Sequence, residues 1–262
     1  MDRWPYPRWI AHRGAGTLAP ENTLAALRAG AGHGYRMFEC DVKLSADGVP
    51  FLMHDATLER TTNGVEIFGR AASVLAGDHP WSELARLDAG GWHSPAYAGE
   101  PVPTLENISR FCLANGYLLN IEIKPTPDLD CRTGEVVARH ADRLWNNASV
   151  PPLLTSFRPE ALQGALATAA RLPRGLLLDK LWQGWLDAAR SLECVAIVCQ
   201  HSLWTSSVVA QVRSAGLRCL SYTVNDEAAA RRMMALGIEG MITDRIDFFD
   251  PTGPGLVGAG PD

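Results

Sequence analysis

The chain has 262 residues, of which 47% are hydrophobic, and a formal net charge of −5 from 24 basic and 29 acidic side chains. This length suffices for one large core, so we expect a single domain over residues 1–262. The acidic balance and the lack of a basic run argue against nucleic acid as a partner. No segment approaches the ~20 uninterrupted apolar residues of a membrane span, and the start has no apolar export signal. The chain is therefore expected to be soluble and free of stable membrane association. Its six scattered cysteines, with no CxxC pair, are typical of a reduced intracellular protein, so we expect it to be cytoplasmic.

Short apolar runs alternate with longer stretches of helical period along most of the chain. The first three runs, 9–11, 37–42 and 118–123, are followed by helical patterns at 22–33, 104–115 and 133–146. The later runs are 153–156, 175–179, 195–200, 217–224 and 240–243, and the helical patterns among them are 159–169, 183–192, 205–215 and 226–236. Repeated strand-then-helix units of this number predict a closed (β/α)8 TIM barrel. An open, doubly wound parallel sheet is the alternative.

One further strand-like run, 49–54, does not fit the barrel count. It follows Asp41 too closely for a parallel crossover, which needs about a dozen residues. Asp47 and Gly48 lie between the two runs, and Asp-Gly between extended runs favours a hairpin. We therefore expect a ribbon that rises above the barrel and brings His54 back beside Asp41.

Residues 57–103 lose the regular period and are rich in Gly, His and Trp. An insertion at the carboxyl ends of barrel strands lies where loops form the active site, so this stretch is expected to cap the mouth. The tail, 251–262, is rich in Gly and Pro and is expected to be disordered.

Charged residues recur at a spacing of two within predicted strands. Glu39 and Asp41 therefore face one side of their strand, and Glu122 and Lys124 face one side of theirs. Several carboxylates in one barrel mouth repel each other unless a cation neutralises them, and the hard cations Mg²⁺ and Ca²⁺ prefer oxygen ligands. The pattern predicts one divalent cation. The alternative is that these are ordinary strand-end charges that face solvent or form salt bridges.

Two histidines are expected at the same rim of the barrel. His12 ends the first strand, and the ribbon returns His54. A histidine alone is more often a core or capping residue, but two imidazoles titrating near pH 6.5 can serve as general acid and general base. Arg13 and Lys124 are placed to hold anionic oxygens, so the set is suited to cleaving a phosphodiester.

Six motifs together resemble the glycerophosphodiester phosphodiesterase family in order and spacing. They are Ala11-His12-Arg13-Gly14, Ala19-Pro20-Glu21-Asn22-Thr23, Glu39-Cys40-Asp41, the run from Val49 to Asp55, Glu122-Ile123-Lys124 and Tyr222-Thr223-Val224-Asn225. The resemblance runs from about Trp4 to Phe249 and is nearest to the cytosolic bacterial branch that accompanies glycerol-phosphate uptake. It implies a phospholipase C-like barrel with a small capping insertion.

The resemblance also implies roles for individual residues. Glu39, Asp41 and Glu122 would bind the metal, His12 and His54 would act as acid and base, and Arg13, Lys124, Tyr222 and Asn225 would contact the substrate. Many members of the family carry Trp where this chain has Tyr222, which bears on substrate fit. Glu21 and Asn22 are expected to fix the His12 loop. Asp244 lies near the rim, but it is equally explained as a turn cap and is not counted in the site.

The implied reaction is hydrolysis of glycerophosphodiesters such as glycerophosphocholine and glycerophosphoethanolamine to sn-glycerol 3-phosphate and an alcohol. The nucleophile is either water or the glycerol 2-hydroxyl. One competing hypothesis is a lysophospholipase D or phospholipase C-like enzyme acting on membrane lipid. Another is a non-catalytic barrel that only binds phosphodiesters, since a fold does not fix a function. The headgroup, the choice of cation and the oligomeric state are left open.

Overall fold

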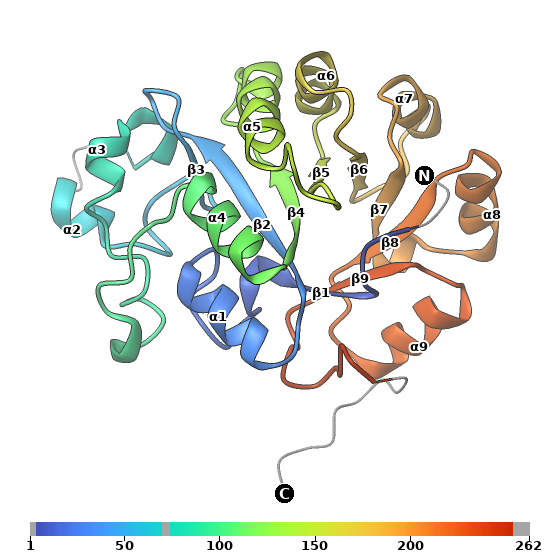
Figure 1. Cartoon of the computed structure of the whole chain (residues 1–262), viewed down its shortest axis with the longest axis horizontal. Coiled ribbons are helices and arrows are strands. Elements are labelled where there is room, and N and C mark those ends of the chain that lie inside the picture. Colours follow the sequence, from blue (N-terminus) through green and yellow to red (C-terminus); the bar gives the residue numbers. More distant parts are fainter. Residues whose placement is uncertain (1–3, 70–73, 254–262) are drawn as a thin grey trace, which may run out of the picture.

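The computed structural model describes residues 4–69 and 74–253, and within these ranges eight parallel strands close into a barrel (Figure 1). The strands are β1 (Trp9–Ala11), β2 (Met37–Leu44), β4 (Leu118–Ile123), β5 (Leu153–Ser156), β6 (Arg174–Leu178), β7 (Ala196–Gln200), β8 (Arg218–Tyr222) and β9 (Gly240–Thr243). The pairing of Ala11 in β1 with Phe38 in β2 closes the ring. The predicted barrel is confirmed, and the open sheet is excluded.

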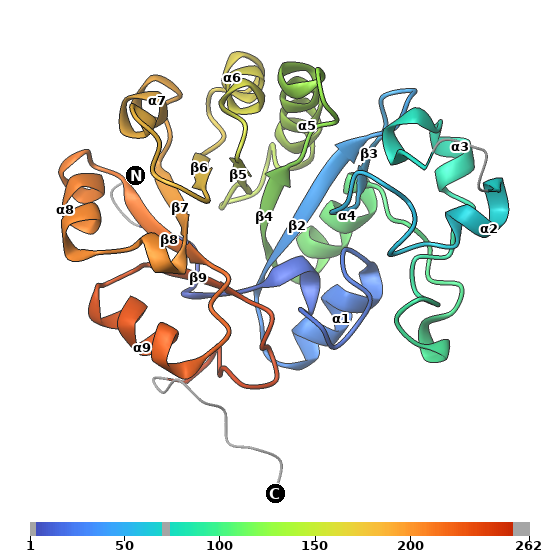
Figure 2. The same cartoon turned by 180° about the vertical axis from the view of Figure 1, so that it is seen from behind.

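Helices surround the barrel on its outside (Figures 1 and 2). They are α1 (Leu24–Gly32), α4 (Leu105–Asn115), α5 (Asp130–Leu144), α6 (Pro159–Thr168), α7 (Trp185–Ser191), α8 (Ser206–Ser214) and α9 (Glu227–Ala235). Thr23, Thr104, Thr205 and Asp226 cap four of them by accepting a backbone N–H with the side chain. Every predicted barrel strand and surrounding helix is present, with boundaries that differ by a few residues at most.

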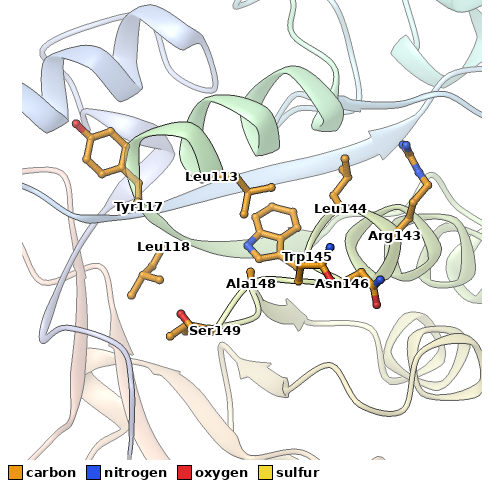
Figure 3. Close-up of a pocket in the computed structure, with 12 residues that line it drawn as sticks. Leu113, Tyr117, Leu118, Arg143, Leu144, Trp145, Asn146, Ala148 and Ser149 are labelled. Atoms are coloured by element: carbon orange, nitrogen blue, oxygen red, sulfur yellow. The ribbon is translucent and has the colours of Figure 1, made fainter.

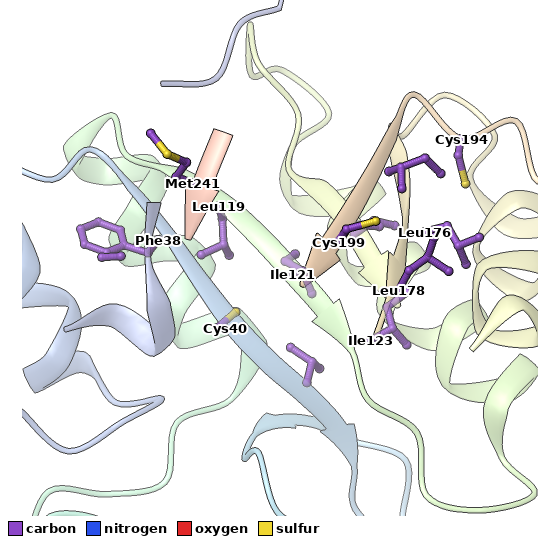
Figure 4. Packing of buried hydrophobic residues seen from close by; sticks show 14 of the residues in the cluster. Phe38, Cys40, Leu119, Ile121, Ile123, Leu176, Leu178, Cys194, Cys199 and Met241 are labelled. Carbon is purple, nitrogen blue, oxygen red and sulfur yellow. The ribbon is translucent and has the colours of Figure 1, made fainter. Parts of the chain in front are cut away.

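The alternation of side chains along each strand divides the buried residues into two cores. Cys40 and Ile121 face outward and pack with residues of the surrounding helices (Figure 4). Ile10, Leu177 and Ile242 belong to a separate core inside the barrel. Because successive residues of a strand point to opposite faces, the neighbours of Cys40 and Ile121 face the barrel interior.

The ribbon beyond the barrel has the predicted form. β3 (Pro50–Leu52) pairs antiparallel with the end of β2, with Leu52 opposite Val42. The next backbone amide, that of Met53, donates to the carbonyl of Asp41 at 3.0 Å. This ladder fixes the position of the following residue, His54.

The stretch after the ribbon forms its own small core beside the barrel (Figure 1). It contains α2 (Gly64–Phe68), α3 (Trp81–Leu84) and the 3₁₀ turns Ala76–Asp78 and Pro95–Tyr97. Among the described residues, three contacts join it to the β1–α1 region. The His93 ring lies 3.0 Å from the carbonyl of Thr17, Glu100 accepts from the backbone amide of Ala25 at 2.9 Å, and Arg60 donates to both oxygens of Glu21 at 2.8 Å. Its role as a cap over substrate stays a prediction.

Of the tail predicted to be disordered, 251–262, residues 254–262 lie outside the described residues. Among the helices that the structure describes, none is both long enough and apolar enough to cross a membrane.

Candidate active site

A cavity of about 160 Å³ opens at the carboxyl ends of the barrel strands. Its lining combines the predicted catalytic residues with an apolar wall: His12, Arg13, Glu39, His54, Asn120, Glu122, Lys124, Phe157, Leu177, Tyr222, Thr223 and Ile242. A larger hollow of about 510 Å³ lies at the other end, where the chain enters β4 and β5, and is lined by residues such as Leu113, Tyr117 and Trp145 (Figure 3). That lining has no histidine and no acidic side chain, whereas the smaller cavity has both.

Three carboxylates meet inside the barrel. Asp41 on β2 pairs in register with Glu122 on β4, and Glu39 lies two residues before Asp41 on the same face. One oxygen from each residue lies within 4.8 Å of the others. Burial and the charge of Asp41 raise the pKa of Glu39 and of Glu122. Such crowded, buried oxygens fit a hard divalent cation, whose charge would relieve the repulsion.

Arg13 and Lys124 supply positive charge to the same cluster. Lys124 Nζ lies 3.4 Å from an oxygen of Asp41 and 3.4 Å from one of Glu122. Arg13 Nε lies 3.3 Å from Asp41, and the Arg13 backbone amide donates to Glu39 at 3.0 Å. Burial alone would raise the pKa of Asp41, but the charges of Lys124 and Arg13 outweigh it and lower that pKa. Both cations therefore lie within reach of an anion bound at the carboxylates.

Both predicted histidines line the cavity, and a carboxylate holds the Nδ1 of each. His12 Nδ1 lies 2.6 Å from Asp244, and His54 Nδ1 lies 2.8 Å from Asp55. With Nδ1 engaged, the Nε2 atom of each ring is left for proton transfer. Burial lowers the pKa of His54. At His12, burial acts in the same direction, but Asp244 and Glu39 outweigh it, so the pKa of His12 is raised.

Asp244 is the principal residue that sequence reasoning left out. It follows β9, the barrel neighbour of β1, so its side chain reaches the His12 that follows β1. Asn225 makes two hydrogen bonds to Asp244. Its Nδ2 donates to Asp244 Oδ2 at 2.7 Å, and its Oδ1 accepts from the backbone amide of Asp244 at 2.9 Å. Asn225 is not among the residues that line the cavity, so its described contacts make it a support for Asp244, and its substrate contact stays a prediction.

Glu21 and Asn22 both contact Arg13 in the loop after β1, as expected, and Glu21 accepts from Arg13 Nη1 at 2.9 Å. The backbone amide of Asn22 donates to the carbonyl of Arg13 at 3.0 Å, which fixes the loop that carries His12. Its side chain donates to an oxygen of Asp41 at 2.8 Å and accepts from the Asp41 amide at 3.0 Å. Asn22 therefore positions a candidate metal ligand as well as the loop.

The other side of the cavity is largely apolar. Tyr222 meets the ring of Phe157 edge-on at 5.7 Å, and its hydroxyl donates to the carbonyl of Leu178 at 3.1 Å. Leu177 and Ile242 complete this wall. Phe157 has no motif around it, and only its place directly after β5 could have identified it.

Comparison of the sequence with protein-family profiles identifies the family of this chain. The profile of the Glycerophosphoryl diester phosphodiesterase family matches residues 12–248, which contain every residue of the site. The chain belongs to this family.

Within the Glycerophosphoryl diester phosphodiesterase family, the relatives differ in how much of their length is shared. A glycerophosphodiester phosphodiesterase of Caldanaerobacter subterraneus subsp. tengcongensis is 30% identical over 90% of this chain and 93% of that protein. The Homo sapiens glycerophosphoinositol inositolphosphodiesterase GDPD2 is 35% identical over 60% of this chain, but the match covers 32% of the human protein. A solved Oleispira antarctica phosphodiesterase, in complex with the product sn-glycerol-3-phosphate, superposes with a TM-score of 0.80 at 32% identity, over 91% of this chain and 93% of that one.

Proposed function

We propose that this chain is a metal-dependent glycerophosphodiester phosphodiesterase that releases sn-glycerol 3-phosphate and an alcohol. The observation that carries the proposal is one cavity in which two histidines, each held at Nδ1 by a carboxylate, face a cluster of three buried carboxylates. Family membership and the product bound to the Oleispira antarctica phosphodiesterase support the same reaction.

In this proposal the chain holds both the cation and the phosphodiester. Glu39, Asp41 and Glu122 bind one Mg²⁺ or Ca²⁺, which supplies Lewis-acid polarisation of a phosphoryl oxygen. Arg13 and Lys124 lie close enough to these carboxylates to hold the non-bridging oxygens of the phosphate. A guanidinium and an ammonium are both suited to that task.

His12 and His54 move the protons. One Nε2 removes a proton from the attacking hydroxyl, and the other gives a proton to the departing alkoxide. The opposite directions of the two pKa shifts suit a pair in which one ring is neutral while the other is protonated. Asp244 and Asp55 keep both rings in the tautomer that presents Nε2.

The substrate in this proposal is a small, water-soluble diester such as glycerophosphocholine or glycerophosphoethanolamine. A cavity of about 160 Å³ has room for only part of such a molecule, so we place the glycerol phosphate inside and the headgroup outside. The apolar wall of Phe157, Leu177 and Tyr222 would face the carbon atoms of the glycerol. The cytoplasmic location inferred from the sequence stays a prediction.

The deciding experiment measures glycerol 3-phosphate release from glycerophosphocholine by the purified chain. We expect no release in EDTA, recovery with Mg²⁺ or Ca²⁺, and loss of the recovered activity in His12→Ala and Glu39→Gln. The exposed His33 serves as the matched control, so His33→Ala should retain activity.

Three outcomes would replace this proposal. The first is release of a phosphorylated headgroup and free glycerol from glycerophosphoinositol. This outcome would give the chain the activity for which human glycerophosphoinositol inositolphosphodiesterase GDPD2 is named. Release only from lysophospholipid would support the lipid phosphodiesterase. Tight binding of glycerophosphocholine without turnover under any metal would support the non-catalytic barrel.

A further inference from the structure

Asn120 is a buried amide inside the barrel to which neither the motifs nor the proposed mechanism gives a role. Its neighbours Leu119 and Ile121 pack in the core outside the barrel (Figure 4), so Asn120 faces inward, on the same side of β4 as Glu122. The residue is 1% exposed, and it lines the candidate active-site cavity.

Only one end of this amide has a partner among the described residues. Thr155 on the neighbouring strand β5 donates its hydroxyl to Asn120 Oδ1 at 3.0 Å. Asn120 Nδ2 makes no hydrogen bond to the described residues. It is nevertheless not fully sealed from solvent. Since the residue lines the cavity, this nitrogen faces the cavity.

The orientation of the amide follows from its surroundings. Glu39 is the register partner of Asn120 on β2, and Glu122 lies two residues along β4, so the space in front of the amide is bordered by carboxylate acceptors. An amide oxygen turned toward these carboxylates would be repelled, whereas an N–H donor is favoured. The Thr155 hydroxyl keeps the oxygen turned away. A buried donor without a protein partner at the floor of a cavity points to a ligand acceptor.

We propose that Asn120 Nδ2 donates a hydrogen bond to a hydroxyl of the glycerol moiety of the bound substrate, and so selects hydroxylated alcohols. This inference rests on the proposed function. A strand rises about 3.3 Å per residue, so Asn120 lies roughly 6.6 Å before Glu122 along β4, at the level of Glu39 and deeper in the barrel than Asp41 and Glu122. Arg13 and Lys124 hold the phosphate nearer the rim, beside Asp41 and Glu122, and the part of the substrate that extends below the phosphate, toward Asn120, is the glycerol. Its hydroxyls are acceptors of the size that fits beside Leu177 and Ile242.

The test compares substrates with and without that hydroxyl. For Asn120→Ala, kcat/KM on glycerophosphocholine should fall roughly tenfold, the loss expected for one hydrogen bond. On bis(4-nitrophenyl) phosphate, which has no glycerol, kcat/KM should change less than about twofold. Thr155→Val, which frees the amide to rotate, should show the same selectivity with a smaller loss.

Controls separate this contact from a structural role. Ser109→Ala removes a buried hydroxyl that bonds the Leu105 carbonyl in α4, and it should leave both substrates unaffected. Near-isosteric Asn120→Leu is the second variant if Asn120→Ala unfolds. Calorimetry with glycerol 3-phosphate gives a second readout, in which the Kd of Asn120→Ala should rise about tenfold while the Mg²⁺ affinity is unchanged.

Equal losses on both substrates, or a weakened Mg²⁺ affinity in Asn120→Ala, would overturn the inference and leave the proposed function standing. A wild-type chain that hydrolyses neither diester would defeat the proposed function. In that case, equal glycerol 3-phosphate affinities of the wild type and Asn120→Ala would defeat the inference as well.

Discussion

Each candidate catalytic histidine depends on a carboxylate, but the two carboxylates come from very different places in the chain. Asp55 directly follows His54, whereas Asp244 is 232 residues from His12. Asn225 holds Asp244 from the adjoining loop, so the orientation of His12 is fixed by the closing strands of the barrel. A carboxylate at Nδ1 sets the tautomer of an imidazole and stabilises its protonated form.

Asp244→Asn is expected to reduce kcat roughly 10- to 1000-fold while KM stays within a few-fold, because the imidazole loses its orienting charge but the phosphate contacts remain. Asp244 raises the pKa of His12, so its removal should move the His12 limb of the pH–rate profile to lower pH. Steady-state kinetics across pH 5–9 would measure both effects. Asp247→Asn, at a partly exposed neighbour paired with Arg245, is the control. An unshifted profile would contradict the role given to Asp244.

Lys43 is buried beside the site, at 4% exposure, with one long hydrogen bond of 3.4 Å to the Lys124 carbonyl. Burial and the charge of Lys124 lower its pKa from 10.5 to about 8. Between these two values the unfolded chain binds a proton that the folded chain does not, so folded stability rises with pH across this range. The cost of burying the charge is fully present below pH 8.

Lys43→Met should therefore stabilise the fold by about 1–3 kcal/mol at pH 7, and the gain should shrink as the pH rises toward 10.5. Urea unfolding in EDTA at pH 7 and pH 9.5 would measure it, with Lys180→Met at an exposed position as control. A less stable Lys43→Met at pH 7 would show instead that Lys43 neutralises the carboxylates.

α5 and α6 pack closely against each other, and glycine makes this approach possible. A Cβ added at Gly164 of α6 would lie 2.1 Å from the carbonyl of Cys131, and one at Gly134 of α5 would lie 1.9 Å from the carbonyl of Ala161. Both contacts are to backbone, so neither can be relieved by a side-chain rotation.

Gly164→Ala should destabilise the protein by about 1–3 kcal/mol, because the two helix backbones have to separate. Gly32→Ala is the matched control, since nothing lies within 4 Å of its added Cβ in α1, and it should be neutral or stabilising by about 0.5 kcal/mol. Thermal unfolding of the two variants would compare them. Equal melting temperatures would show that α5 and α6 shift apart freely.

The elements were predictable from the sequence because their period is local. The runs at 9–11, 118–123, 153–156 and 240–243 match their strands, and the Asp47-Gly48 turn predicts the β2–β3 hairpin. Contacts between distant residues were not predictable in this way. Two such contacts are the hydrogen bonds of Asn22 to Asp41 and of His12 to Asp244. They depend on the register of neighbouring strands, which no local pattern encodes.

At the scale of the whole molecule, the barrel interior concentrates negative charge that the fold does not fully neutralise. Burial, and then the charge of Asp41, raise the pKa of the carboxyls of Glu39 and Glu122, which is the electrostatic cost of placing them inside the barrel. A cation that binds only the folded chain removes that cost and shifts the folding equilibrium.

Saturating Mg²⁺ or Ca²⁺ should raise the unfolding free energy by about 2.7 kcal/mol at a concentration 100 times Kd. Because the cation displaces protons from Glu39 and Glu122, the gain should diminish as the pH falls. Thermal unfolding with and without metal at pH 6 and pH 8 would measure it. Glu122→Gln should lose the gain, and the exposed Glu160→Gln should keep it. A gain that survives in Glu122→Gln would place the cation elsewhere.

One strand belongs to both parts of the molecule: β2 carries Glu39 and Asp41 inside the barrel and then continues outward to pair with β3. The backbone of Asp41 closes that ladder immediately before His54. A hydrogen-bonded ladder therefore sets the spacing between His54 and the candidate metal ligands, and the segment 57–103 follows this ladder. We therefore expect that exchanging this segment changes which diesters are admitted, while the β2–β3 ladder keeps the spacing between His54 and the carboxylates.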